Sequence, residues 1–260
     1  IEDILIKPTW EELKEEDKDK FLIEIDPGIS FGTGKHETTQ LCINQLIKYV
    51  KPGDTVLDLG CGSGILSIVA KKLEAGKMAM TDIDPAAITA SKENFQVNHI
   101  AMDDIDLYDG NIIDDEELQK KVGFNKYDVV VANILADVII PISAIVDKFL
   151  RKGGIFISSG IIYMKEEDVV DAIKKNHKLK FMETVNQGDW RAIMAQKISD
   201  YVICVHGDQI EKYGTPEEIF TEGYIPKLYQ MTTGSYDELT GDLELPAVQG
   251  EPKVFVLTGN

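Results

Sequence analysis

Cysteine and histidine are scarce in this chain of 260 residues. The three cysteines, Cys42, Cys61 and Cys204, are widely spaced and form no C-x-x-C pair. An odd and sparse set suits a reducing cytoplasm, where we expect the protein, better than a disulfide scaffold. The four histidines are also dispersed along the chain, so no metal site is expected.

Positive charge and long apolar runs are lacking as well. The 27 Lys and Arg residues stand against 45 Asp and Glu residues, which gives a formal net charge of -18. That excess disfavours direct binding to nucleic acid and is compatible with a basic protein partner. The sequence has no apolar run of about 18 residues and no charged-then-apolar leader, so no membrane partner and no export are expected.

Glycine is concentrated in one short stretch, around which the rest of the chain is organised. Residues 55–59 read as a buried strand, Gly60, Gly62 and Gly64 as a tight turn, and the apolar residues from Ile65 as a helix. Such a unit presents backbone N–H groups to a ligand at the carboxyl edge of a parallel sheet. A dinucleotide fingerprint would need its third glycine at position 65, which is Ile, so the spacing argues against NAD.

An acidic residue follows this unit at the end of the next expected strand. Residues 77–82 end in Asp82, which is placed to accept hydrogen bonds from ribose hydroxyls. With Asp58 before the first glycine, the pattern D-x-G-x-G-x-G plus Asp82 resembles the class I methyltransferases that use S-adenosylmethionine (SAM). The alternative is a glycine turn of another α/β protein, in which Asp82 only caps the helix that starts near Pro85.

The remaining pattern alternates strands with helices. Tyr127–Asn133 is the clearest buried strand and places Asn133 at the carboxyl edge of the sheet. Thr38 or Thr39 is expected to cap a helix over residues 40–50, whereas residues 99–124 are acidic and poorly periodic apart from a strand at 105–108. Other expected elements are strands 21–25, 155–159, 180–185 and 190–196, helices 85–98, 137–150 and 166–175, a Gly153–Gly154 turn and a hairpin loop at 186–189.

These elements predict an α/β fold, a Rossmann-like seven-stranded sheet with helices on both faces and a hairpin at its end. This is the architecture that the resemblance to class I SAM-dependent methyltransferases implies. Residues 198–260 are expected to add a small α+β appendage that starts with a strand pair at 201–205 and 209–213.

Five separated motifs make the resemblance more specific. They are the glycine-bearing stretch from Asp26-Pro27-Gly28 to Gly34, His36 with Thr38 and Thr39, the glycine turn at 58–66, Asp82-Ile83-Asp84-Pro85, and residues 131–136. Over residues 5–197 they resemble the PrmA-type enzymes that methylate ribosomal protein L11. Lys35 and Glu37 depart from the usual pattern, in which Thr and Pro are expected. These departures concern the conformation of the loop before residue 38, not the type of cofactor.

The resemblance implies a SAM pocket whose contacts are Thr39, Gly60, Gly62, Asp82, Asn111 and Asn133. Gly60 would let the backbone pass close to the methionine part of SAM, and Asp82 would hold the ribose diol. Thr39 would donate its hydroxyl from a loop over the cofactor, and Asn111 would face the adenine. Asn133 is the candidate catalytic residue, because its amide would align the incoming amine with the methyl group.

His36 is the candidate base for deprotonating the amine. A lone loop histidine is more often only a hydrogen-bonding element, and this alternative stays open at the level of sequence.

The chain is expected to have three parts. Residues 1–20 read as a linker from a missing N-terminal domain that docks the ribosomal substrate, and residues 21–197 as the methyltransferase domain. Residues 199–260 hold 11 acidic and 3 basic residues and include Gly-Thr-Pro-Glu-Glu at 214–218, where Thr215 is expected to cap a helix. That stretch resembles the C-terminal part of ABC transporter ATP-binding subunits, but the chain lacks a Walker A motif and a Leu-Ser-Gly-Gly-Gln signature, which excludes an ATPase.

The resemblance implies a SAM-dependent N-methyltransferase that modifies lysine or N-terminal amino groups of ribosomal protein L11. The alternatives are a non-catalytic SAM-binding scaffold and a methyltransferase for another protein or small-molecule amine. Enzymes that methylate planar amides typically carry Asn-Pro-Pro-Tyr after this strand, whereas here the residues are Asn133-Ile134-Leu135-Ala136. Neither the modified amine nor the oligomeric state is predicted.

Overall fold

The computed structural model describes residues 4–18, 20–25, 36–198, 202–206 and 209–214, together with 219, 224, 235–236 and 243–244. The chain divides into two compact units, Ile1–Ser199 and Asp200–Asn260. The loop at 26–35, which carries the first predicted motif, and the predicted cap at Thr215 lie outside the described residues.

A seven-stranded sheet in the order β5-β4-β3-β6-β7-β9-β8 forms the centre of the first unit. Strands β3 to β7 are parallel, and β9 and β8 form an antiparallel hairpin at one edge. The bounds are β3 Val56–Leu59, β4 Met78–Asp82, β5 Ile105–Asp109, β6 Tyr127–Asn133, β7 Leu150–Ile162, β8 Leu179–Gln187 and β9 Trp190–Lys197. The predicted seven-stranded α/β fold is therefore confirmed.

The order of the strands places a topological switch point beside β3. The chain moves from β3 outward to β4 and β5, and then returns to add β6 and β7 on the other side of β3. The carboxyl ends of β3 and β6 therefore flank the crevice where open α/β sheets bind their ligands.

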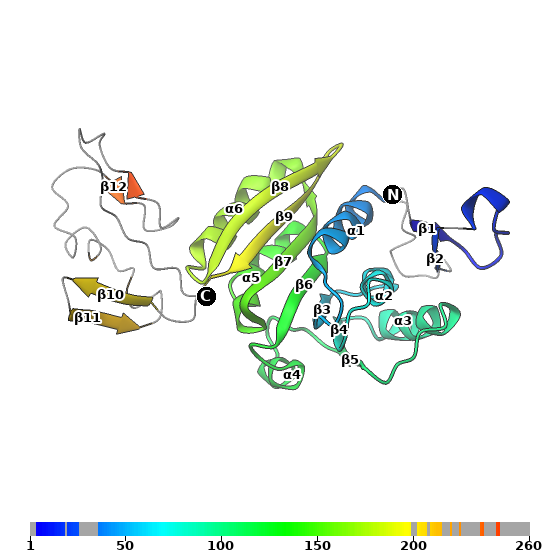
Figure 1. Cartoon of the computed structure of the whole chain (residues 1–260), viewed down its shortest axis with the longest axis horizontal. Coiled ribbons are helices and arrows are strands. Elements are labelled where there is room, and N and C mark those ends of the chain that lie inside the picture. Colours follow the sequence, from blue (N-terminus) through cyan, green and yellow to red (C-terminus); the bar gives the residue numbers. More distant parts are fainter. Residues whose placement is uncertain are drawn as a thin grey trace. The chain divides into compact units, whose positions relative to one another are not determined.

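Helices cover both faces of the sheet (Figure 1). One face carries α1 Glu37–Tyr49, α2 Ile65–Lys72 and α3 Pro85–Val97, and the other carries α4 Glu116–Val122, α5 Ala136–Ser143 and α6 Glu166–Lys175. Because successive strand residues point to opposite faces, Val129 and Val131 pack with α1 to α3 while Val130 packs with α4 to α6. Each such aliphatic side chain stabilises the fold by about 1.5 to 3 kcal/mol relative to exposure.

A small two-stranded ribbon precedes α1. Strand β1 Ile4–Lys7 pairs in parallel with β2 Phe21–Glu24, with a 3-10 turn η1 at Glu15–Asp17 between them. The ribbon is tied to α3 because Asn98 accepts from the Glu24 N–H at 2.9 Å and donates to the Glu24 carbonyl at 2.7 Å. Residues 4–7 thus form a paired strand, and the idea that residues 1–20 are a linker stays a prediction.

Two helices differ from the sequence-based expectation. Helix α1 begins at Glu37, three residues early, and its cap is His36, whose Nδ1 accepts from the Thr38 N–H at 3.4 Å. The predicted threonine cap is therefore wrong. Helix α4 lies in the segment 99–124, whose acidic and poorly periodic sequence predicts no helix. Asp115 caps it by accepting from the Leu118 N–H at 2.9 Å.

The segment between β6 and β7 is the largest difference. The helix predicted over 137–150 ends at Ser143, a 3-10 turn η2 at Val146–Lys148 follows, and Leu150 already belongs to β7. The predicted Gly153–Gly154 turn is instead an irregularity inside β7, with Gly153 at φ +79° and a register shift against β6. A buried apolar run fits a helix and a strand equally well, and this explains the error.

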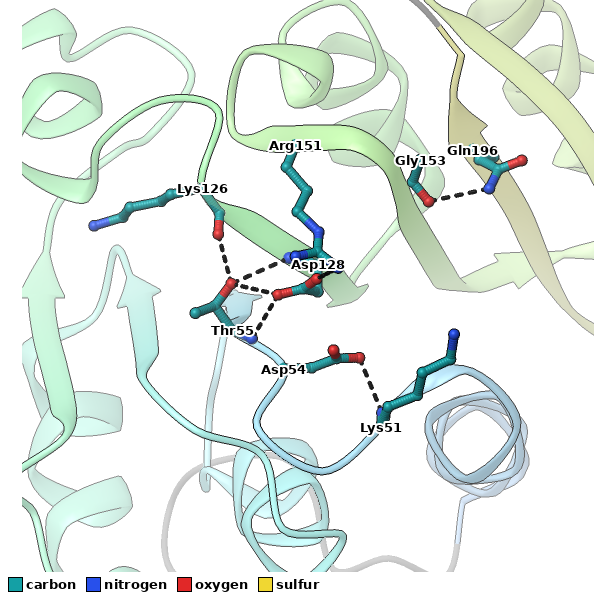
Figure 2. A network of polar contacts seen from close by, with 8 residues as sticks. All are labelled: Lys51, Asp54, Thr55, Lys126, Asp128, Arg151, Gly153 and Gln196. Atoms are coloured by element: carbon teal, nitrogen blue, oxygen red, sulfur yellow. Dashed lines mark hydrogen bonds and ion pairs between the residues drawn. The ribbon is translucent and has the colours of Figure 1, made fainter. Parts of the chain in front are cut away.

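Polar contacts join the amino ends of β3, β6 and β7 (Figure 2). Asp128 Oδ2 accepts from the Thr55 N–H at 2.8 Å and lies 2.8 Å from the Thr55 hydroxyl, which also reaches the Lys126 carbonyl. Asp128 Oδ1 forms an ion pair with the Arg151 guanidinium. We call Thr55, Lys126, Asp128 and Arg151 the amino-edge network.

The second unit contains two antiparallel strand pairs in its described part. Strands β10 Val202–His206 and β11 Gln209–Gly214 confirm the predicted pair, and β12 Ser235–Tyr236 pairs with β13 Leu243–Glu244. Across the described residues of both units, no helix combines the length and apolar character needed to cross a membrane.

Candidate functional site

The glycine turn lies at the carboxyl end of β3, beside the switch point. Gly60 and Cys61 donate their N–H groups to the Thr81 carbonyl of β4 at 2.8 and 3.0 Å. Gly60 adopts φ +72°, and a Cβ at this position would lie 2.6 Å from Ile134 Cγ2. Glycine is favoured here by the backbone conformation and by the close approach of Ile134, so the turn and the loop after β6 are in contact.

Two polar side chains of α3 support the turn from below. Ser91 donates its hydroxyl to the Gly62 carbonyl at 3.0 Å, and Asn94 donates to the Ser63 carbonyl at 2.9 Å. Both side chains are buried, so these bonds hold the turn in one conformation. Sequence reasoning missed this support, although two polar residues three apart within an otherwise buried helix face are a signal that could have revealed it.

Asp82 lies at the end of β4 and faces the glycine turn. Its Oδ2 accepts from the Gly62 N–H at 2.9 Å and its Oδ1 accepts from the Asp84 N–H at 3.0 Å. The cap of α3 is Asp84, which accepts from the Ala86 N–H at 2.9 Å, so the reading of Asp82 as a mere helix cap is wrong. A carboxylate has about four acceptor positions, so Asp82 keeps about two for a ligand.

Asn133 ends β6 on the other side of the crevice. Its Nδ2 donates to Thr39 Oγ1 at 3.3 Å, which joins β6 to the first turn of α1. Thr39 is buried and belongs to this helix, so the expectation that it sits on a loop is wrong. The amide is thereby oriented with Oδ1 as its remaining acceptor.

His36 stands at the start of α1. Its Nδ1 lies 3.0 Å from Thr38 Oγ1, and its ring contacts Trp190 edge-on with 5.0 Å between ring centroids. Together with the cap bond to Thr38, these contacts assign His36 a structural role at the junction of α1 and β9. They supply no observation for a role as base.

Asn111 follows Gly110, whose N–H donates to the Asp82 carbonyl at 2.9 Å, so the Asn111 loop lies beside the end of β4. Asn111 itself comes after the edge strand β5, where its Nδ2 donates to Asp114 at 2.8 Å and its Oδ1 accepts from the Ile113 N–H at 3.1 Å. Within the described part of the chain, its hydrogen bonds stay in its own loop. The proposed contact with adenine therefore stays a prediction.

Asp58 is the first residue of the D-x-G-x-G-x-G pattern, and the sequence alone assigns it no role. It is buried, its Oδ2 accepts from the Ser67 hydroxyl at 2.7 Å, and its Oδ1 has no hydrogen-bond partner. Burial raises the pKa of the Asp58 carboxyl to about 7, the Ser67 bond opposes part of the rise, and nearby Asp82 adds to it. This oxygen is one of four buried side-chain atoms without a hydrogen-bond partner among the described residues, the others belonging to Gln45, Asp128 and Tyr224.

The described residues near the glycine turn provide neither a reactive thiol nor a metal site. Burial, followed by the nearby Asp58, raises the pKa of the Cys42 and Cys61 thiols, so neither thiol is set up as a nucleophile. Among the residues that the structure describes, no group of three His, Cys, Asp or Glu side chains could hold a metal ion.

Comparison with known proteins places this geometry in a family. The family model for ribosomal protein L11 methyltransferase (PrmA) matches residues 1–198. A ribosomal protein L11 methyltransferase of Agathobacter rectalis is 60% identical over 202 residues, 76% of this chain and 62% of that relative. One from Lachnoclostridium phytofermentans is 51% identical over 207 residues, 75% of this chain and 62% of that relative.

A solved structure agrees with the fold. The ribosomal protein L11 methylase of Lactobacillus delbrueckii subsp. bulgaricus is 34% identical, covers 75% of this chain and 94% of that chain, and superposes with a TM-score of 0.65. The present chain spans 62% of the length of the first curated relatives it matches. The matches end by residue 198 in the family model, so the resemblance of the later residues to ABC ATP-binding subunits stays a prediction. On this evidence, the chain belongs to the ribosomal protein L11 methyltransferase (PrmA) family.

Proposed function

We propose that this chain binds SAM at the carboxyl edge of the sheet and transfers its methyl group to amino groups of ribosomal protein L11. The observation that carries the proposal is that two hydrogen-bonded pairs of residues lie at the carboxyl ends of the strands on either side of the switch point. Gly62 and Asp82 stand on one side and Thr39 and Asn133 on the other, and family membership supports the same reading. Because ribosomal proteins are made in the cytoplasm, we place the reaction there.

The residues present fit this cofactor. The remaining acceptor positions of Asp82 suit the hydroxyls of a ribose, and the unsatisfied Oδ1 of Asp58 suits a cationic or N–H-bearing group beneath the turn. When bound, SAM supplies an electrophilic methyl group on a sulfonium sulfur. No protein nucleophile is needed, and among the described residues the thiols of Cys42 and Cys61 are not set up as one.

The chain's contribution to the reaction is alignment. Asn133 Oδ1 can accept a hydrogen from the incoming amine, while its Nδ2 is held by Thr39, so the amide keeps one orientation. The amine must arrive deprotonated, because its lone pair forms the new N–C bond while the electrons of the broken C–S bond stay on sulfur. The proton that the nitrogen then loses passes to water.

Transfer of labelled methyl from SAM to purified ribosomal protein L11 tests the proposal. Asn133→Ala should lower kcat/KM by about 100-fold, which is the cost of losing one preorganised hydrogen-bonding group. Asp82→Asn should weaken SAM binding in calorimetry, whereas Asp106→Asn, an exposed carboxylate on the neighbouring strand β5, should not. Binding of SAM without methyl transfer would instead favour the non-catalytic scaffold, and transfer to small amines alone would favour the small-molecule alternative.

A further inference from the structure

Four exposed apolar side chains follow the carboxyl ends of β6 and β7, and the proposed chemistry does not use them. Leu135, the N-cap of α5, and Val138 in its first turn are 70% and 38% exposed, and Tyr163 and Met164 in the 3-10 turn η3 after β7 are 50% and 67% exposed. Leu135 and Val138 thus stand at the start of one helix. We call these four residues the β6–β7 patch.

The two halves of the β6–β7 patch are adjacent. Lys165 of η3 lies 3.5 Å from Asp137 of α5, and β6 and β7 are neighbouring parallel strands with Asn133 opposite Ser159. A Cβ at Gly160 would lie 2.2 Å from the Ile134 carbonyl oxygen, so the loop after β6 is pressed against β7. The Tyr163 N–H also donates to the Asp189 carbonyl in the β8–β9 hairpin at 2.8 Å. The segments that carry the patch are therefore fixed by contacts among α5, β7 and the β8–β9 hairpin.

Acidic side chains surround the patch. Exposed carboxylates stand on α5, α6 and the hairpin, at Asp137, Glu167, Asp168 and Asp189. The two nearby cations are engaged, since Lys165 pairs with Asp137 and Asp168, and Arg191 pairs with Glu166 at 2.7 Å. An apolar surface with a negative rim complements a segment that carries both aliphatic side chains and protonated amines.

We propose that the β6–β7 patch is the docking surface for the segment of the acceptor protein that surrounds the target amine. This inference rests on the proposed function and deepens it, because it assigns substrate recognition to residues outside the cofactor site. Leu135, Val138, Tyr163 and Met164 cover apolar side chains of that segment, and the carboxylates around them attract its amines. Docking here delivers an amine to Asn133, which lies two residues before Leu135.

Direct binding of fluorescently labelled ribosomal protein L11 to the full chain tests the proposal, measured by anisotropy with S-adenosylhomocysteine present. Leu135→Gln and Met164→Gln should each raise the Kd about tenfold, since each removes apolar surface that becomes buried. The matched controls are Leu13→Gln and Met182→Gln, which are 36% and 37% exposed and lie away from α5 and η3; they should leave the Kd within twofold. Raising salt should weaken binding of the unaltered chain.

SAM binding by calorimetry separates this inference from the proposed function. If all variants bind SAM like the unaltered chain and only the two patch variants lose affinity for L11, the inference holds. It is overturned if the patch variants bind L11 normally, or if the unaltered chain that binds SAM does not bind L11. Sedimentation of the chain alone gives a third check: a dimer that Met164→Gln dissociates would assign the patch to a second copy.

Discussion

The two edges of the central sheet use polar residues in opposite ways. At the amino edge, Asp128 accepts from Thr55 through Oδ2 and forms an ion pair with Arg151 through Oδ1, so the network joins three strands. At the carboxyl edge, Asp58 keeps an unsatisfied oxygen and Asp82 and Asn133 keep acceptor positions beyond their bonds to the protein. Buried acceptors without partners cost stability, and the Asp58 oxygen lies beneath the glycine turn, where we propose that SAM binds.

The comparison separates stability from ligand binding in a way that mutations can test. Substitutions at the amino edge should change the free energy of unfolding and leave SAM affinity alone. Substitutions at the carboxyl edge should change ligand binding. Two of them, at Gly160 and Asp58, should also change stability, because Gly160 has a positive φ and Asp58 is a buried carboxyl. Trp10 and Trp190 both belong to the first unit, so tryptophan fluorescence reports its unfolding alone.

Gly160→Ala should have the largest effect on stability. Gly160 adopts φ +85°, and a Cβ would lie 2.2 Å from the Ile134 carbonyl oxygen, so both the backbone conformation and a clash oppose alanine. We expect a loss of about 3 to 5 kcal/mol in urea unfolding. Gly53→Ala, at φ +84° with no atom within 4 Å of the new Cβ, should lose only about 1 kcal/mol, and equal losses would refute the clash.

Asp58 should make stability depend on pH. Its pKa is about 7 in the folded chain and about 4 when unfolded, so the folded state binds the proton more tightly. The associated stabilisation is complete below about pH 4 and is lost as the pH rises to about 7. The free energy of unfolding, compared with Asp58→Asn in the absence of SAM, should fall by about 2 to 3 kcal/mol between pH 5 and pH 8.

Ser67→Ala offers a matched variant for this prediction. The Ser67 hydroxyl donates to Asp58 Oδ2 and holds its pKa down, so its removal should move the decline in stability to higher pH. An unfolding free energy that is flat between pH 5 and pH 8 in the unaltered chain, relative to Asp58→Asn, would contradict the assignment.

Asp128→Ala should cost about 2 kcal/mol while SAM affinity stays within twofold. The substitution leaves the Thr55 N–H without its acceptor at an edge far along the strand from the glycine turn. Urea unfolding and SAM calorimetry on the same preparation check both halves. A large loss of SAM affinity with normal folding would contradict the conclusion that the amino edge contributes to stability and not to SAM binding.

Arg151→Ala should have the smallest effect, at most about 1 kcal/mol. The Arg151 side chain is 58% exposed, so solvent screens its charge, and the buried Asp128 carboxylate keeps its bonds to Thr55 when Arg151 is removed. A loss as large as that of Asp128→Ala would show that the ion pair, rather than the Thr55 hydrogen bonds, holds the amino-edge network together.

Much of the fold followed from local patterns. The sequence predicts Tyr127–Asn133 and Glu166–Lys175 with the ends that the structure shows; in the strand, the apolar run Val129–Ala132 stands between Asp128 and Asn133. The errors fall where two local readings compete. The segment 137–150 is apolar enough for either element, and His36 took the capping position that a threonine was expected to hold.

The family and the residues of the glycine turn could be predicted because the chemistry of the motif is contiguous in sequence. The contacts that complete the site could not. The bond from Asn133 to Thr39 joins residues 94 positions apart, and the one from Gly62 to Asp82 spans 20. The roles of Ser91, Asn94 and the unsatisfied Asp58 oxygen also depend on which helix packs beneath the turn.

By itself, the sequence determined the alternation of strands and helices, the glycine turn and the acidic residue after the next strand. These depend on period, backbone freedom and charge, which are local properties. The tertiary structure alone decided which polar groups satisfy one another and which keep an open acceptor, because burial and distance between remote residues exist only once the sheet is assembled. It also decided that Leu135 and Met164 are exposed, at the start of α5 and in η3, two segments that the ion pair of Asp137 and Lys165 joins.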